Sequence, residues 1–107
     1  MTVYVRAQIL RWVSDDFPGF VECMFADSSG REWSIIEKAS AVSGANLRSN
    51  SQFPQTALIA CNVVASGQDD GGREIAHVTT ITPFAIEAAD GTTSFQLYAE
   101  QLQVSDD

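Results

Sequence analysis

The chain has few basic residues, and it has no long hydrophobic run. Six lysine and arginine residues stand against fourteen acidic ones in 107 residues, which gives a formal net charge of −8. A surface of this sign repels nucleic-acid phosphates and anionic lipid, so we expect neither to be a ligand. No segment approaches the roughly 20 consecutive apolar residues that a membrane-spanning helix needs, so we expect no membrane partner.

Cysteine is also scarce, and the N-terminus lacks the pattern of a signal peptide. The first residues alternate between apolar and polar types, whereas a signal peptide has a basic flank followed by an apolar block. Two cysteines in a domain of this size are far below the density of a disulfide scaffold. We therefore expect a cytoplasmic protein in which Cys23 and Cys61 are buried and reduced.

Side chains suited to catalysis or metal binding are few. His77 is the only histidine and has no nucleophile at motif spacing, so a catalytic triad lacks support and His77 is interpreted as a structural or surface residue. A zinc site needs about four ligands, and two isolated cysteines with one histidine fall short of that number. Segment 69–72 lacks the spaced carboxylates of a calcium loop. No glycine-rich phosphate loop precedes a helix. We expect no catalytic residue, no metal and no cofactor.

Alternating apolar residues and turn formers are abundant. A hydrophobic fraction of 45% in 107 residues is typical of one folded domain covering the whole chain. Hairpin-linked segments predict an all-β domain: a small antiparallel barrel or rolled sandwich of about six to eight strands, with one helical turn near 38–43. The alternative is an oligonucleotide-binding-type barrel, whose usual ligands the acidic charge disfavours. Residues 105–107 are expected to fray.

Segment 84–99 predicts the hairpin around which the rest of the chain is organised. Asp90-Gly91 is typical of a two-residue type I′ turn, which fixes the pairing of the flanking residues. The expected pairs are Ala89 with Thr92, Ala88 with Thr93, Ile86 with Phe95, and Phe84 with Leu97. This register gives the hairpin one apolar face, which another sheet layer must cover.

A second hairpin is predicted around Gly30. A three-residue loop with this glycine in the left-handed conformation fixes the register of strand 20–26 and the strand that follows. The expected pairs are Asp27 with Arg31, Phe25 with Trp33, and Cys23 with Ile35. A slip of one residue would place Phe25 opposite a glutamate, so the turn and the apolar pairing favour the same register.

Strands also flank these hairpins. Residues 3–9 predict a half-buried first strand, and its alternation fails at 11–13, where the strand either ends or bulges. Segment 45–55 has no periodicity and predicts a long surface loop. Residues 100–104 predict either a last strand or one helical turn.

The middle of the chain predicts a central strand over 57–65, because one of its faces is apolar throughout and the other is partly so. The glycine-rich segment 66–72 is expected to end this strand. Residues 73–82 predict the returning strand, and the pattern leaves its facing open.

Six residues are candidates for contact with a partner protein. Asp15 and Asp16 precede Phe17 in a segment rich in turn formers, and an exposed aromatic flanked by acids is typical of a protein-binding loop. The other candidates are Arg48 in the 45–55 loop and Asp69 and Asp70 in the 66–72 turn. An ordinary polar turn is the simpler interpretation of each aspartate pair.

The leading hypothesis is a small acidic protein without catalytic activity that binds a basic protein. Neutralising a basic toxin or enzyme, as an immunity or inhibitor protein does, fits this hypothesis, because covering a basic active site needs acidic charge on a rigid scaffold. The alternative is a β-barrel that holds a small ligand in its mouth under the 45–55 loop, and an enzyme is a third hypothesis. Unpaired edge strands also allow a homo-oligomer.

Overall fold

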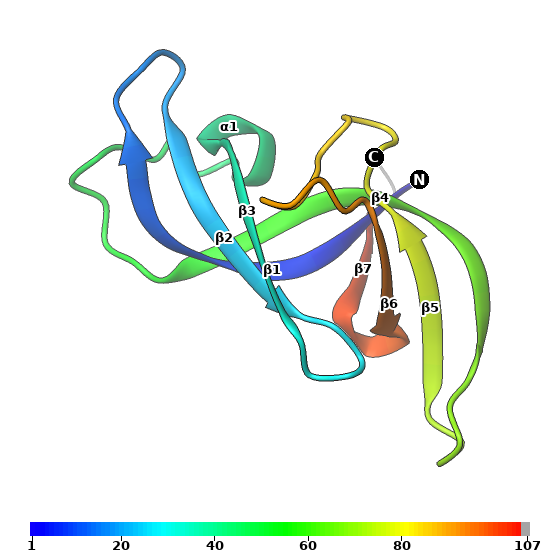
Figure 1. Ribbon diagram of the computed structural model, residues 1–107. Helices are drawn as coiled ribbons and strands as arrows, with labels where there is room; N and C mark the ends of the chain where they lie inside the picture. Colours follow the sequence, from blue (N-terminus) through cyan, green and yellow to red (C-terminus); the bar gives the residue numbers. More distant parts are fainter. Residues whose placement is uncertain (106–107) are drawn as a thin grey trace.

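The computed structural model describes residues 1–105 and confirms an all-β fold (Figure 1). Seven antiparallel strands form one curled, half-barrel sheet, with one short helix and one 3₁₀ turn. In chain order the elements are β1 (Thr2–Ser14), β2 (Phe20–Ala26), β3 (Glu32–Lys38), α1 (Ala39–Val42), β4 (Gln55–Gln68), β5 (Glu74–Thr79), β6 (Ser94–Tyr98), the 3₁₀ turn Ala99–Gln101 and β7 (Leu102–Ser105).

The sheet is organised around the long strand β1. Its order is β3-β2-β1-β4-β5-β6, and β7 also pairs with β1. One edge of β1 carries β4, while the opposite edge carries β7 near its start and β2 near its end. The register shifts twice near the end of β1, after Ile9 and after Trp12, which confirms the bulge interpretation. These bulges bend the strand so that one element serves both halves of the sheet.

The concave side of the sheet holds a single hydrophobic core. Alternate residues of each strand point into it, as the period of two requires. The ring of Phe95 on β6 meets the rings of Phe25 and Trp33 edge to face, with centroids 5.1 Å apart in both pairs. This contact between β6 and the β2–β3 hairpin is the seam that closes the sheet. Two backbone hydrogen bonds also cross it, from Ser28 N–H to Gln96 O and from Ala89 N–H to Ser34 O. The first and last strands of the sheet path are thereby held together.

The predicted β2–β3 hairpin is confirmed in register. The pairs Asp27 with Arg31, Phe25 with Trp33 and Cys23 with Ile35 are all present. The Asp27 carboxylate also accepts hydrogen bonds from the N–H groups of Ser29 and Arg31 and from the Trp33 indole. The acid therefore fixes both the loop and a core aromatic.

Three hairpin loops of this chain share one construction. In each, the first residue pairs with the fifth, and the fourth is a glycine with φ between 82° and 89° whose N–H returns to the first carbonyl. A left-handed fourth residue followed by an extended fifth is the usual three-residue loop with a glycine bulge. The loops are 27–31 with Gly30, 69–73 with Gly72, and 88–92 with Gly91.

The predicted 84–99 hairpin is wrong in two respects. Its turn is the three-residue loop just described, so Ala88 rather than Ala89 faces Thr92. Residues 84–88 also form no strand, because β5 occupies the edge of β6 and pairs Val78 with Phe95. That pairing buries both of these side chains, whereas Phe84 lies exposed.

Buried Thr80 links this segment to Thr93 and Ile86 instead. Its N–H donates to the carbonyl of Thr93, and its carbonyl accepts from the N–H of Ile86. Its hydroxyl donates to the Ile86 carbonyl at 2.6 Å. Ile86 therefore reaches the core without pairing with Phe95, and the other expected pairs, Phe84 with Leu97 and Ala88 with Thr93, are absent as well.

Strand β4 is central, as predicted, but it is longer than expected. It continues through Gly67 to Gln68, and all residues from 62 to 68 are exposed, including the expected core residues Val63 and Ala65. The reason is that β1 pairs with β4 only as far as Cys61, beyond which β4 has β5 alone as a partner. The returning strand β5 ends at Thr79 and directs Ala76 and Val78 inward.

The remaining segments agree with the sequence in outline. The helical turn lies at Ala39–Val42, and Leu47 and Phe53 of the 45–55 loop pack against the core. The C-terminal segment forms both a 3₁₀ turn and a strand. Ser105 was expected to fray, but it pairs with Thr2 as the last residue of β7, and the other two residues of that prediction lie outside the described part.

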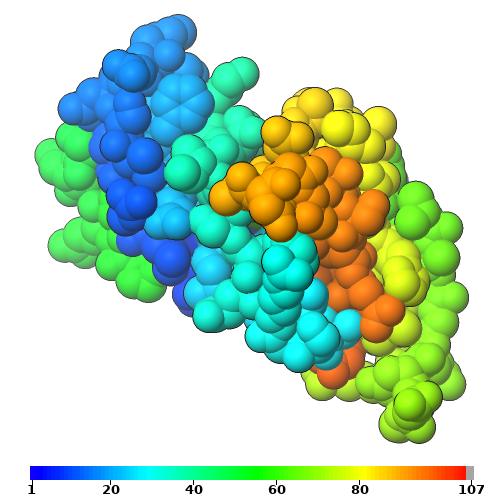
Figure 2. Space-filling model, in the orientation of Figure 1, coloured from blue at the N-terminus to red at the C-terminus, as the bar shows by residue number. Residues whose placement is uncertain are grey.

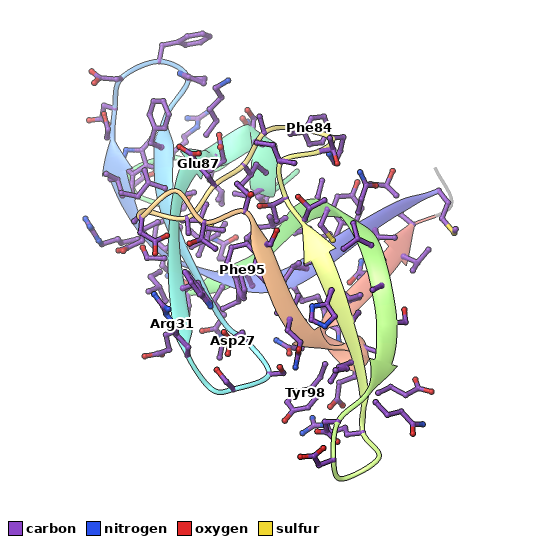
Figure 3. The ribbon with its side chains drawn as sticks, turned by 45° about the vertical axis from the view of Figure 1, so that its right-hand side comes forward. Asp27, Arg31, Phe84, Glu87, Phe95 and Tyr98 are labelled. Atoms are coloured by element: carbon purple, nitrogen blue, oxygen red, sulfur yellow. The ribbon has the colours of Figure 1, made fainter. Side chains whose placement is uncertain are left out.

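Replacing Phe95 by alanine should destabilise the protein by about 3–5 kcal/mol, as expected when a large buried aromatic is removed. Figure 3 shows Phe95 between β6 and the β2–β3 hairpin, whereas Phe84 lies at the outside. Phe84→Ala is the matched control and should change the free energy of unfolding by less than about 0.5 kcal/mol. Urea unfolding measures both, and equal effects would contradict the proposed seam.

The contribution of Asp27 to stability should depend on pH. Burial works to raise the pKa of Asp27, but hydrogen bonds from Ser29, Trp33 and Arg31 outweigh it and hold the pKa below the ordinary 3.8. A lowered folded-state pKa stabilises the fold above the unfolded pKa, and this stabilisation is lost as the pH falls through the folded value.

The free energy of unfolding should therefore differ most between wild type and Asp27→Asn near neutral pH. The difference should shrink once the pH falls below about 4. Asp70→Asn, which removes an exposed carboxylate from another loop, is the control for the change in net charge. A difference that stays constant from neutral to acidic pH would exclude this role for Asp27.

Candidate functional site

The structure separates the six candidate contact residues into two groups at opposite ends of the molecule. Asp15, Asp16 and Phe17 lie in the β1–β2 loop, and Asp69 and Asp70 lie in the β4–β5 loop (Figure 1). The longest axis of the protein measures 43 Å. A standard interface covers about 800 Å² on each partner, a patch about 30 Å across, so the two loops do not share one contact of that size.

The β1–β2 tip is a braced turn. The Trp12 indole donates to the Asp15 carboxylate at 2.7 Å, and the N–H of Asp16 donates to the Ser14 hydroxyl at 3.0 Å. The Gly19 N–H returns to the carbonyl of Asp16, and the Gly19 carbonyl accepts from the N–H that begins α1. Both ends of the tip are therefore tied to the body of the protein.

Gly19 is required at the base of this tip. Its φ is 97°, and a Cβ at this position would lie 2.5 Å from the Trp12 ring. The left-handed conformation and the close approach of the ring both exclude a side chain. The packing of Gly19 under Trp12 fixes where the tip leaves the sheet.

Phe17 is presented at the top of the tip. Its side chain is 97% exposed, the largest exposed fraction among the large hydrophobic residues of the described chain. Figure 2 shows the tip, in blue, projecting beyond the rest of the surface. Asp16 is exposed beside Phe17, and no hydrogen bond to its carboxylate is seen among residues 1–105. The tip therefore offers an apolar ring next to an uncompensated negative charge.

Arg48 lies at the same end of the molecule as this tip. The 45–54 loop borders a hollow of about 300 Å³ whose wall includes Pro18 of the tip. Arg48 itself is exposed, and its backbone forms a small turn with Ser51 through two hydrogen bonds. Its neighbour Leu47 lines that hollow with Pro18, so Arg48 lies toward the tip, although no hydrogen bond or ion pair joins it to the tip within residues 1–105.

The two aspartates at the opposite end differ from each other. The Asp69 carboxylate accepts hydrogen bonds from the N–H groups of Gly71 and Arg73, both at 2.9 Å. Asp69 is therefore part of the loop, as Asp27 is in the equivalent loop. Asp70 is exposed at the loop apex.

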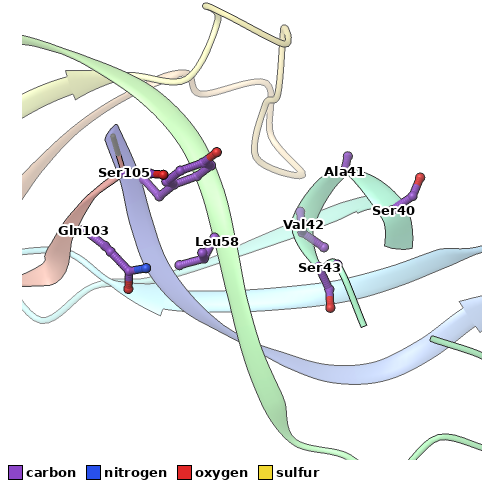
Figure 4. A pocket seen from close by; sticks show the side chains of 9 residues that line it. Ser40, Ala41, Val42, Ser43, Leu58, Gln103 and Ser105 are labelled. Carbon is purple, nitrogen blue, oxygen red and sulfur yellow. The ribbon is translucent and has the colours of Figure 1, made fainter. Parts of the chain in front are cut away.

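The interior of the curled sheet is filled by side chains. The core residues of the sheet, with Ala39 and Val42 of α1, form one continuous cluster. The hollows lie at the surface instead, and one of about 290 Å³ separates α1 from Leu58, Gln103 and Ser105 (Figure 4). A small ligand in the mouth under the 45–55 loop stays a prediction, and the space seen at that loop is the surface hollow of about 300 Å³ beside Pro18.

One charged cluster was not foreseen from the sequence. The Arg73 guanidinium lies over the Tyr98 ring, 3.5 Å from its centroid, and pairs with Glu100. Arg6 donates to the backbone carbonyl of Glu100. The hydrogen bond and charge of Arg73 hold the pKa of Glu100 below its ordinary value. Because both arginines are already engaged, the cluster is a structural link between β1, the β4–β5 loop, β6 and the 3₁₀ turn.

The cysteines are buried and reduced, as expected. Burial raises the pKa of Cys61 to about 11, and burial with the charges of Glu37 and Glu22 raises the pKa of Cys23 to about 12. A thiol with such a pKa is a poor nucleophile near neutral pH. His77 is exposed on β5, as its surface interpretation required.

The described part of the chain is residues 1–105. No helix in this range is long and apolar enough to cross a membrane. Within the same range, no three histidine, cysteine or acidic side chains gather closely enough to hold a metal ion.

Comparisons with protein-family models, curated proteins and solved structures found no match to this chain.

Gly19→Ala should destabilise the protein more than Gly72→Ala does. Gly72 has a similar φ of 82° but open space around it, so its substitution carries only the left-handed conformational cost of about 1–2 kcal/mol. Gly19→Ala adds the collision with Trp12, which should cost a further 1–3 kcal/mol or so. Urea unfolding followed by tryptophan fluorescence measures the difference, and equal effects would exclude the close packing.

Proposed function

We propose that this protein binds a basic partner protein through the β1–β2 tip, with Phe17 as the anchor and Asp16 as the main charge. The observation that carries the proposal is a fully exposed phenylalanine on a backbone that is already ordered. The partner is a protein with positive charge around an apolar recess, and a toxin or enzyme with a basic active site has this chemistry.

The exposed Phe17 side chain adds nothing to the stability of the folded protein. Burying a side chain of this size stabilises a complex by about 1.5–3 kcal/mol, which is the contribution that an anchor residue supplies. Ordering a flexible loop on binding would offset part of this gain. Because hydrogen bonds already fix both ends of the tip, most of the contribution from Phe17 remains available for affinity.

The sign of the charge defines the partner. The chain carries −8 overall, and the exposed Asp16 carboxylate lies beside the anchor. A field of this sign accelerates encounter with a basic surface, and the acceleration weakens as salt is added. Arg48 adds one positive charge near the tip, which favours a partner whose basic surface includes an acidic residue. Asp69 and Asp70 lie too far away to join this contact.

Phe17→Ala should weaken partner binding about 30-fold or more, the effect of losing a 2 kcal/mol anchor. Asp16→Asn should weaken it only several-fold and should reduce its dependence on salt. The experiment immobilises the full chain, captures proteins from host extract at low ionic strength, and compares the variants. Phe84→Ala, which removes an exposed phenylalanine elsewhere, is the matched control.

The supporting result is a basic protein retained by wild type and Phe84→Ala, lost with Phe17→Ala and released by salt. Phe17→Ala should unfold at the same urea concentration as wild type, because the side chain contributes no packing. Equal retention by Phe17→Ala and wild type would contradict the proposed anchor.

A further inference from the structure

The second half of β4 is an open sheet edge. Pairing with β1 ends where Val3 meets Cys61, and from Asn62 to Gln68 the strand pairs with β5 alone. No other strand of the described chain lies along that edge. Figure 1 shows this half of β4 at the margin of the molecule, with β5 on its inner side.

The phase of the ladder shows which backbone groups face the open side. The Asp69 N–H donates to the carbonyl of Arg73, which makes this pair a hydrogen-bonded one. Antiparallel pairs alternate between bonded and non-bonded, so Gly67 also bonds to β5. The N–H and C=O groups of Ser66 and Gln68 therefore point outward. They form a ready template for another extended strand.

Apart from one bulge, this edge lacks the usual protection of exposed strands. Residues 62–68 contain no charged residue and no proline, and Val64 is 66% exposed. Natural edges are usually blocked by lysine, proline or a covering loop. A bulge at Val64 is the one protective feature, and it lies before the outward groups of Ser66 and Gln68.

We propose that the occupant of this edge is a second copy of the chain, paired antiparallel over residues 65–67 about a two-fold axis at Ser66. Antiparallel pairing of one segment with itself is self-complementary, because each copy offers the same donors and acceptors. In this register Ser66 faces its own copy and Ala65 faces Gly67 of the other molecule, while the bulge at Val64 limits the hydrogen-bonded pairing to Ser66.

Charge favours this register despite the net charge of −8 on each copy. The uncharged edge brings no like charges directly opposite each other. The Asp69 residues of the two copies lie six strand residues apart, about 20 Å at roughly 3.4 Å per residue. That separation exceeds the Debye length of about 8 Å at physiological salt, so their repulsion is largely screened. The remaining long-range repulsion means that salt should promote the dimer.

The dependence on salt distinguishes this contact from the proposed tip contact. Binding of a basic partner should weaken as ionic strength rises, whereas edge pairing between two acidic copies should strengthen. Either contact can therefore fail in experiment without affecting the conclusion about the other.

Sedimentation velocity of the purified full chain tests the edge. The average mass should rise with protein concentration toward that of a dimer. The rise should be larger at about 1 M salt, where the Debye length is about 3 Å, than at about 0.01 M salt, where it is about 30 Å. Ser66→Pro should remain monomeric, because proline removes the outward N–H that would bond to the second copy. It should keep the wild-type unfolding curve, since proline is tolerated where an edge N–H faces solvent.

Ser49→Pro is the matched control. Position 49 follows Arg48 in an exposed turn of the 45–54 loop, where proline is compatible with the backbone. This variant should associate as wild type does. A wild type that stays single at high concentration and high salt, or a Ser66→Pro that associates equally well, would overturn the proposal.

Charge pairing tests the two-fold register directly, and it remains informative if the proline variant fails to fold. Ser66→Asp and Ser66→Lys each set like charges opposite each other, so each alone should associate less than wild type. An equimolar mixture should associate more than either alone, because the mixed dimer pairs opposite charges. A mixture that behaves as the average of its components would exclude the register.

Discussion

The edge-on contact of Phe95 with Phe25 and Trp33 is the interaction on which the rest of this structure depends. It joins β6, the last strand of the sheet path, to the β2–β3 hairpin at its other end. A flat sheet with this sequence would leave the apolar faces of both ends in water. Curling the sheet until these rings meet encloses the core, and it leaves loops and one strand edge as the surfaces available for binding.

The parts of the fold that the sequence predicts well are those decided by neighbouring residues. The loop at Gly30 and the strands beside it form one local unit, because turn chemistry and apolar pairing demand the same register there. The bulge in β1 and the helical turn after β3 were also visible as local failures of alternation.

The 84–99 segment shows why a local pattern can mislead. Asp90-Gly91 fits both a two-residue turn and a three-residue loop, and only one positive φ, at Gly91, is adopted. The choice of partner for β6 is not local at all. Val78 and Ala76 compete with Ile86 and Ala88 for the same edge, and the competition is decided by burial across the whole sheet.

The candidate site was predictable in type but not in arrangement. The sequence predicts an exposed phenylalanine beside acidic residues. The structure places Phe17 outside the core on an ordered turn. That Asp69 and Asp70 lie at the other end depends on where the long β4 strand leaves the sheet, which no local pattern encodes. The Arg73, Tyr98 and Glu100 cluster likewise joins distant segments that share no motif.

The repeated five-residue loop has a consequence for how this protein can change. Each copy fixes its register through its first, fourth and fifth positions. Two of the three apices carry further contacts, because Ser28 and Ala89 bond across the closed sheet to Gln96 and Ser34. The Asp70 side chain makes no such bond within residues 1–105, so this corner can change its surface chemistry while the register and the interior stay the same.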